Sequence, residues 1–86
     1  MLPAQNTFRA IVKSDEENPE LLAGATAHIV DTTLAAIADT NGVVVIQNIP
    51  DGEKVIEVSM LGYFKKRIKV IFPQPKGATT VEIKLQ

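Results

Sequence analysis

Residues 41–63 of this chain read NGVVVIQNIPDGEKVIEVSMLGY, which is two β-branched runs on either side of a turn. Such side chains suit a pleated, half-buried surface. The pairs Asn41-Gly42 and Asp51-Gly52 supply residues that tolerate positive φ, and Gly62 follows the second run. We therefore expect a β-hairpin that turns at Asp51-Gly52, with Gly42, Gly52 and Gly62 as structural turn positions.

Alternation of apolar and polar residues predicts further strands at residues 7–13, 25–31, 34–38, 64–72 and 79–86. Clusters of Gly, Pro, Asn and Asp separate these runs, and no helical period of useful length occurs. The pattern predicts an all-β fold, an antiparallel β-sandwich of about seven strands whose order stays open. The expected core consists of inward residues of each strand, namely Phe8, Val12, Ile29, Val44, Ile46, Ile49, Ile56, Val58, Val70, Ile83 and Leu85.

Length and composition favour a binding or scaffolding role. The 86 residues form one domain, which we place at residues 7–86 after a flexible N-terminal segment at residues 1–6, and they leave little room for a deep catalytic cavity. The net charge of −1 creates no field that would attract nucleic acid. Without cysteine there is no thiolate metal site, and no apolar run is long enough for membrane insertion. A signal peptide removed earlier stays possible.

Three polar features of the sequence are candidates for a chemical site. The acidic residues 14–20 lack the D-x-D-x-D-G spacing of a calcium loop, which favours a solvated loop. His28 is the only histidine and is expected on the outward face of a strand, so a catalytic or metal role is disfavoured. The basic run at residues 65–69 has no interleaved aromatics and is typical of a solvated sheet edge, with Lys66 expected inward or at a bulge. We predict no catalytic, cofactor or metal residues.

Several short motifs occur in a characteristic order: Gly24-Ala25-Thr26, Asp39-Thr40-Asn41-Gly42, Pro50-Asp51-Gly52 and Leu61-Gly62-Tyr63. Together they resemble the carboxypeptidase regulatory-like domain over nearly the whole chain, from about residue 8 to residue 85. That resemblance implies a transthyretin-like (prealbumin-like) Greek-key sandwich. The form of residues 59–63 is most similar to the N-terminal extension of SusC-type TonB-dependent receptors of Bacteroidetes.

The resemblance implies a non-catalytic accessory or interaction module of a bacterial cell-envelope or secreted protein, associated with outer-membrane nutrient uptake. It also implies a periplasmic or cell-surface location and a protein partner in the envelope, either the parent receptor or a neighbouring domain. The alternative is a small-ligand or carbohydrate-binding sandwich, for which exposed aromatic side chains would form the platform.

Alternation also yields a candidate interaction surface. Val43, Val45 and Val55 are expected to point away from the core on adjacent strands of the central hairpin, and Ile11 and Val30 can extend the patch. Ordinary β-propensity on a solvated face is the competing interpretation. The domain is expected to be a monomer or a weak homodimer.

Overall fold

The computed structural model describes residues 6–74 and 80–86, which form seven β-strands and no helix. The strands are β1 (Asn6–Ser14), β2 (Thr26–Ile29), β3 (Ala35–Ile37), β4 (Val43–Ile49), β5 (Gly52–Ser59), β6 (Lys66–Phe72) and β7 (Val81–Leu85). Asn6 already belongs to β1, and the rest of the expected flexible segment, residues 1–5, lies outside the described part. Within that part, no helix is long and apolar enough to cross a membrane.

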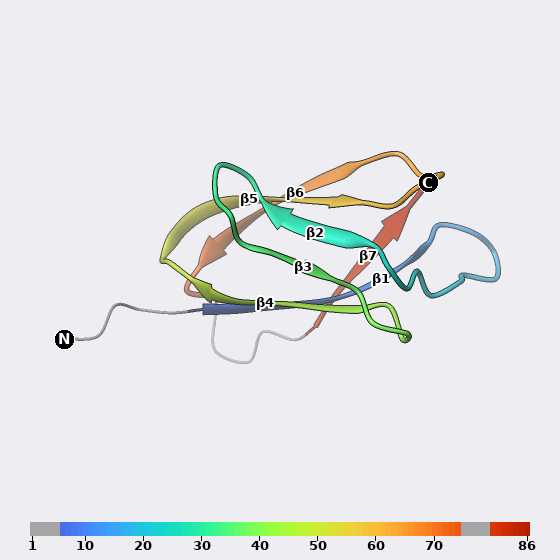
Figure 1. Cartoon of the computed structure of the whole chain (residues 1–86), viewed down its shortest axis with the longest axis horizontal. Helices are drawn as coiled ribbons and strands as arrows, with labels where there is room; N and C mark the ends of the chain where they lie inside the picture. Colours follow the sequence, from blue (N-terminus) through green and yellow to red (C-terminus); the bar gives the residue numbers. More distant parts are fainter. Residues whose placement is uncertain (1–5, 75–79) are drawn as a thin grey trace.

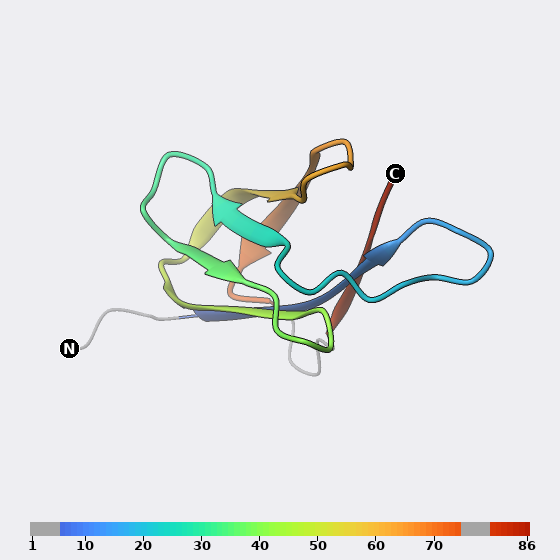
Figure 2. The same ribbon diagram turned by 45° about the vertical axis from the view of Figure 1, so that its right-hand side comes forward.

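The strands form two sheets that pack face to face. One sheet has the order β4-β1-β7 and the other the order β3-β2-β5-β6, and β4 runs beside β1 under the four-stranded layer (Figures 1 and 2). The predicted all-β sandwich of about seven strands is confirmed. One ladder departs from the antiparallel expectation, because β1 and β7 run parallel. Nothing local in a strand's sequence specifies the direction of its neighbour, so alternation did not reveal this pair.

The predicted central hairpin is wrong. β4 pairs with β1 and β5 pairs with β2 and β6, so the connection through Pro50 carries the chain from one sheet to the other. Asn48, with φ of +62°, lies just before this corner. In a hairpin the apolar faces of both strands point the same way, whereas here they point at each other across the core. Alternation along each strand is the same in both cases, and therefore does not distinguish them.

The core lies between the two sheets. Ten of the eleven predicted core residues are buried, and the eleventh, Val70, is half-buried against them. Phe72 and Leu22 are also buried, together with several alanines that the prediction did not include. Ser14 is the one buried polar residue among those described, and its Oγ accepts a hydrogen bond from the Glu20 backbone N–H at 2.9 Å. That bond closes the acidic loop, whose residues 15–20 are all exposed.

Hydrogen bonds connect the tight corner before β4 to β1, and β1 to the segment at Leu22. The Gly42 carbonyl accepts from the Val12 N–H at 2.8 Å, and the Val12 carbonyl accepts from the Leu22 N–H at 2.9 Å. Gly42 has φ of +74°, and a Cβ placed on it would lie 2.6 Å from the Val12 carbonyl oxygen. Gly52 and Gly62 also have positive φ, of +121° and +90°, but no atom lies within 4 Å of a Cβ at either position.

The Asp39 side chain stabilises this corner through two hydrogen bonds, so replacing it should lower the stability of the domain. Its Oδ1 accepts from the Asn41 N–H at 2.8 Å and from the Val43 N–H at 3.0 Å. We expect Asp39→Ala to lower the free energy of unfolding by about 1 kcal/mol, because both exposed donors then turn to water. Urea denaturation measures the change, and Thr40→Ala in the same exposed loop is the control. Equal stabilities of the two variants would show that the carboxylate does not hold the corner.

Candidate interaction surfaces

Two of the three predicted surface valines lie together on the outer face of the three-stranded sheet. Val43 and Val45 are half-buried on β4, and they alternate with the buried Val44 and Ile46. β1 brings Ile11 directly opposite Val43, and Arg9 opposite Val45. Ile11, Val43 and Val45 therefore form one aliphatic cluster, which we call the β1–β4 face patch.

Val55 does not belong to that patch. It lies on β5 in the other sheet, where it is paired with Lys69 of β6, and its carbonyl accepts from the Val30 N–H at 2.9 Å. The outer faces of the two sheets point in opposite directions, since their inner faces enclose the core. The expected single patch across Val43, Val45 and Val55 is thus wrong, for the same reason that the hairpin was: β4 and β5 are not neighbours in one sheet.

Charged residues frame the β1–β4 face patch. β1 lies between β4 and β7, so Ile11 has Val43 on one side and Glu82 of β7 on the other. Lys13 Nζ is 3.3 Å from a Glu82 carboxylate oxygen. The exposed Arg9 lies beside Val45. The patch is therefore an apolar centre with a polar rim, which is the usual anatomy of a protein-binding surface.

His28 has a structural contact. It is half-buried on the outer face of β2, and its Nε2–H donates to the Thr32 carbonyl at 2.7 Å, across the turn that follows the strand. The hydroxyl of Thr32 in turn donates to the Ile29 carbonyl at 2.8 Å and accepts from the Leu34 N–H at 3.0 Å. The ring is thus tied to a turn that leads into β3. Among residues 6–74 and 80–86, no group of three His, Cys, Asp or Glu side chains is arranged to hold a metal ion.

The basic run at residues 65–69 divides into two parts. Arg67 Nε lies 3.3 Å from Glu57, and Lys69 Nζ lies 3.6 Å from Glu53, so both cations pair with carboxylates on β5. Lys66 lies on the inward face of β6, as expected, but its side chain is exposed, and its Nζ donates to the Lys84 carbonyl of β7 at 3.3 Å. The ladder sets Lys66 opposite the buried Val58, whose side chain points to the same face. Lys66 is exposed because it lies at the start of β6, at the end of the sandwich, where its side chain reaches across to β7.

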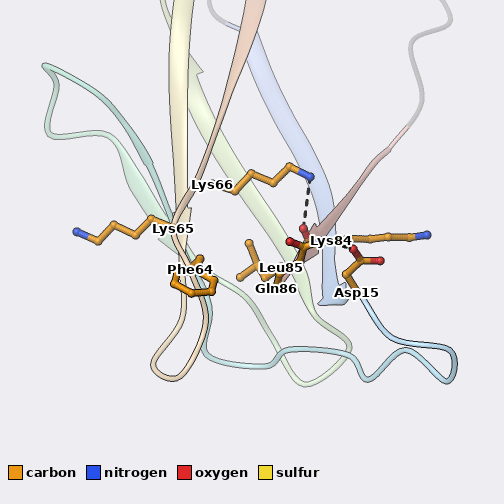
Figure 3. A pocket seen from close by; sticks show the side chains of 7 residues that line it. All are labelled: Asp15, Phe64, Lys65, Lys66, Lys84, Leu85 and Gln86. Atoms are coloured by element: carbon orange, nitrogen blue, oxygen red, sulfur yellow. Dashed lines mark hydrogen bonds between the residues drawn. The ribbon is translucent and has the colours of Figure 1, made fainter.

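Sequence reasoning missed the residues around the β5–β6 loop. Leu61 is 98% exposed and Phe64 is 82% exposed. The predicted strand at residues 64–72 included Phe64, whereas β6 begins at Lys66, and alternation assigns no side to a loop residue. Phe64 also lines a surface hollow of about 270 Å³ with Lys65, Lys66 and Lys84 (Figure 3).

Comparisons with known proteins identify the type of domain. The family model described as CarboxypepD_reg-like domain matches residues 12–86. No curated protein matches the sequence.

Two solved chains share the fold, and both come from a type II cohesin–X-dockerin complex of Acetivibrio cellulolyticus. One, from an N-terminal interface mutant, has a TM-score of 0.69 and 23% identity, over 91% of this chain and 50% of that chain. The other, from a C-terminal interface mutant, has a TM-score of 0.67 and 21% identity, over 92% of this chain and 50% of that chain. This chain therefore spans half the length of the solved chains it matches.

Proposed function

The chain belongs to the CarboxypepD_reg-like domain family, and on that premise we propose that it is a non-catalytic interaction module of a bacterial cell-envelope or secreted protein. Its place would be the periplasm or the cell surface, in association with outer-membrane nutrient uptake. The resemblance of residues 59–63 to the N-terminal extension of SusC-type receptors supports this setting. Its partner would be the receptor to which such an extension is joined, or a neighbouring domain of that protein.

The observation that carries the proposal is the β1–β4 face patch. A solvated sheet face in a sandwich is usually polar, whereas here Ile11, Val43 and Val45 place three aliphatic side chains side by side at its centre. Covering them with an apolar surface would remove them from water, and the rim of Arg9, Lys13 and Glu82 would set the orientation.

Two further facts support a protein as the occupant. The solved chains with this fold are about twice as long as this one, so there a sandwich of this kind is joined to a further segment. They are also parts of a complex between proteins, as their descriptions state. We therefore commit to a domain of the parent receptor as the partner on this face.

We expect Val43→Lys/Val45→Lys to weaken binding of the domain to the receptor encoded with it at least about tenfold, because two ammonium groups would have to be desolvated in the contact. Isothermal titration of the domain in trans against that receptor measures the effect. Gln47→Lys is the matched control for Val45→Lys alone, since each adds one positive charge on the same face of β4 and Gln47 lies outside the aliphatic cluster.

Thermal unfolding of each variant separates loss of binding from loss of fold, and Ile11→Thr tests the same patch while keeping a β-branched residue. Equal affinities for wild type and the double variant would refute the patch as the docking surface. Saturable binding of a sugar or small molecule, with no response to the receptor, would instead favour the ligand-binding alternative. The exposed Phe64 is the aromatic that such a site would use.

A further inference from the structure

A second surface lies at the end of the sandwich formed by the β5–β6 loop and the end of β7. It consists of Leu61, Phe64, Lys65, Lys66 and Lys84, and we call it the β5–β6 end surface. Phe64 and the three lysines line one hollow, and Leu61 lines a second hollow that shares Lys65 with the first. Leu61 and Phe64 are the two most exposed large apolar side chains in the described part of the chain. Two such side chains within four residues of one loop are more than the scattered single exposures common on soluble proteins.

The backbone beneath this surface is well anchored. The Phe64 N–H donates to the Gln86 carbonyl at 2.6 Å, and Lys66 Nζ donates to the Lys84 carbonyl at 3.3 Å, which joins the starting end of β6 to the end of β7. The Tyr63 N–H donates to the Met60 carbonyl at 3.0 Å and closes the loop. Leu61 and Phe64 are thus presented by a loop tied at both sides, so a partner would not have to order it on binding.

The charge at this end is unbalanced. Lys13, Arg67 and Lys69 each have a carboxylate partner, whereas none of Lys65, Lys66 and Lys84 forms an ion pair with a carboxylate of residues 6–74 or 80–86. Asp15 also lines the hollow, and its carboxylate accepts a hydrogen bond from the neutral Gln86 amide at 2.6 Å. The lining of the hollow therefore carries three ammonium groups and one carboxylate, Asp15, and is positive on balance.

The hollow also has a defined shape. It measures about 270 Å³ and is lined by Phe64, Leu85, Gln86 and Asp15 along with the lysines. Figure 3 shows the Lys65 and Lys84 side chains extending from opposite sides of it, with Phe64 between them and Lys66 reaching across. A ligand that crosses this end would meet a cation, then an aromatic ring, then a second cation.

We propose that the β5–β6 end surface binds an extended acidic segment of a partner protein, with one apolar side chain against Phe64, a second against Leu61, and carboxylates beside Lys65, Lys66 and Lys84. Because the surface is positive, charge complementarity favours a negatively charged partner. Leu61 favours a peptide over a sugar, because an aliphatic side chain offers no flat face for stacking. The concave hollow favours a chain that enters it over a flat anionic bilayer, which would leave it unfilled. This site is separate from the β1–β4 face patch and does not depend on it.

The test is a titration of the ¹⁵N-labelled domain with a blocked peptide in which Asp and Glu flank a Leu-Phe pair. We expect amide shifts at Leu61, Phe64, Lys66 and Lys84 that saturate and weaken with added salt. Lys66→Glu/Lys84→Glu should raise the dissociation constant about tenfold, since two attractive contacts become repulsive. Arg9→Glu is the control, because it reverses an exposed charge on the same outer face of the three-stranded sheet as Lys84 but outside the hollow.

A second pair of variants tests the apolar part without changing charge. Leu61→Ser/Phe64→Ser should raise the dissociation constant of the peptide about as much. Ile71→Ser, at an exposed apolar position on β6 away from this surface, should leave the dissociation constant unchanged. A peptide with Lys in place of its acidic residues should not bind. Binding that is unchanged in Lys66→Glu/Lys84→Glu would overturn the proposal. So would vesicles of phosphatidylcholine and phosphatidylglycerol, or oligogalacturonate, shifting these amides while the acidic peptide leaves them unmoved.

Discussion

Replacing Ile56 by alanine should lower the free energy of unfolding by about 2 to 5 kcal/mol. Ile56 is fully buried on β5, at the centre of the four-stranded sheet, where it lies between Ile29 of β2 and Ile68 of β6. The truncation removes three buried carbons from the interior between two sheets that are each held by paired strands. The backbone has little freedom to close around the cavity, which raises the cost of the missing contacts.

Urea denaturation followed by far-ultraviolet circular dichroism measures this change. Val55→Ala is the matched control, because Val55 is the adjacent residue of the same strand and is half-buried on the outer face. We expect the control to cost about 1 kcal/mol or less. If Val55→Ala proved the more damaging substitution, the inward and outward sides of β5 would have to be exchanged.

The second large effect is expected at Gly42, where alanine should cost about 3 to 5 kcal/mol. Two penalties combine there. The positive φ of +74° is unfavourable for any residue with a Cβ, and the added Cβ would lie 2.6 Å from the Val12 carbonyl oxygen. That oxygen accepts the Leu22 N–H hydrogen bond, so moving it aside would disturb the link between β1 and the buried Leu22.

Gly62→Ala separates these two penalties. Gly62 also has a positive φ, of +90°, but no atom lies within 4 Å of an added Cβ. It should therefore show the conformational penalty alone, about 1 to 2 kcal/mol. The same denaturation experiment applies to both variants. Equal losses at the two positions would mean that the Gly42 corner relaxes freely and that the close approach to Val12 has no energetic weight.

The sequence predicted well those features that depend on one strand at a time. Ile46, Ile83 and Leu85 were assigned to the core because side chains alternate across a strand, and all three are buried. Short residues gave a weaker signal. Ala10 and Ala27 are buried as completely as the isoleucines, but their small apolar area does not mark them as core.

Features that depend on which strands become neighbours were not predictable in this way. The runs around Val44 and Ile56 read the same whether their strands pair in one sheet or face each other across the core. The parallel pairing of Ile11 with Glu82 likewise joins residues far apart in the sequence. These choices are made by tertiary packing, and the grouping of Val55 with Val43 and Val45 failed with them.

For the candidate surfaces too, alternation predicted which side of a strand a residue faces but not which residues become neighbours. Alternation placed Val43 and Val45 outward, and the strand pairing then supplied Ile11 as their neighbour. The exposure of Leu61 and Phe64 depends on how the β5–β6 loop is tied to the end of β7, through the bond from the Phe64 N–H to the Gln86 carbonyl. No periodicity reports on a loop, so that surface emerged only from the three-dimensional arrangement.

The most direct test of the account is to map binding on the ¹⁵N-labelled domain while a soluble fragment of the receptor encoded with it is added. An interaction module that docks through the β1–β4 face patch should show its largest amide shifts at Ile11, Val43 and Val45, with Val55 and Val30 on the opposite face unaffected. Shifts confined to the outer face of the four-stranded sheet, or none anywhere at saturating receptor fragment, would contradict it.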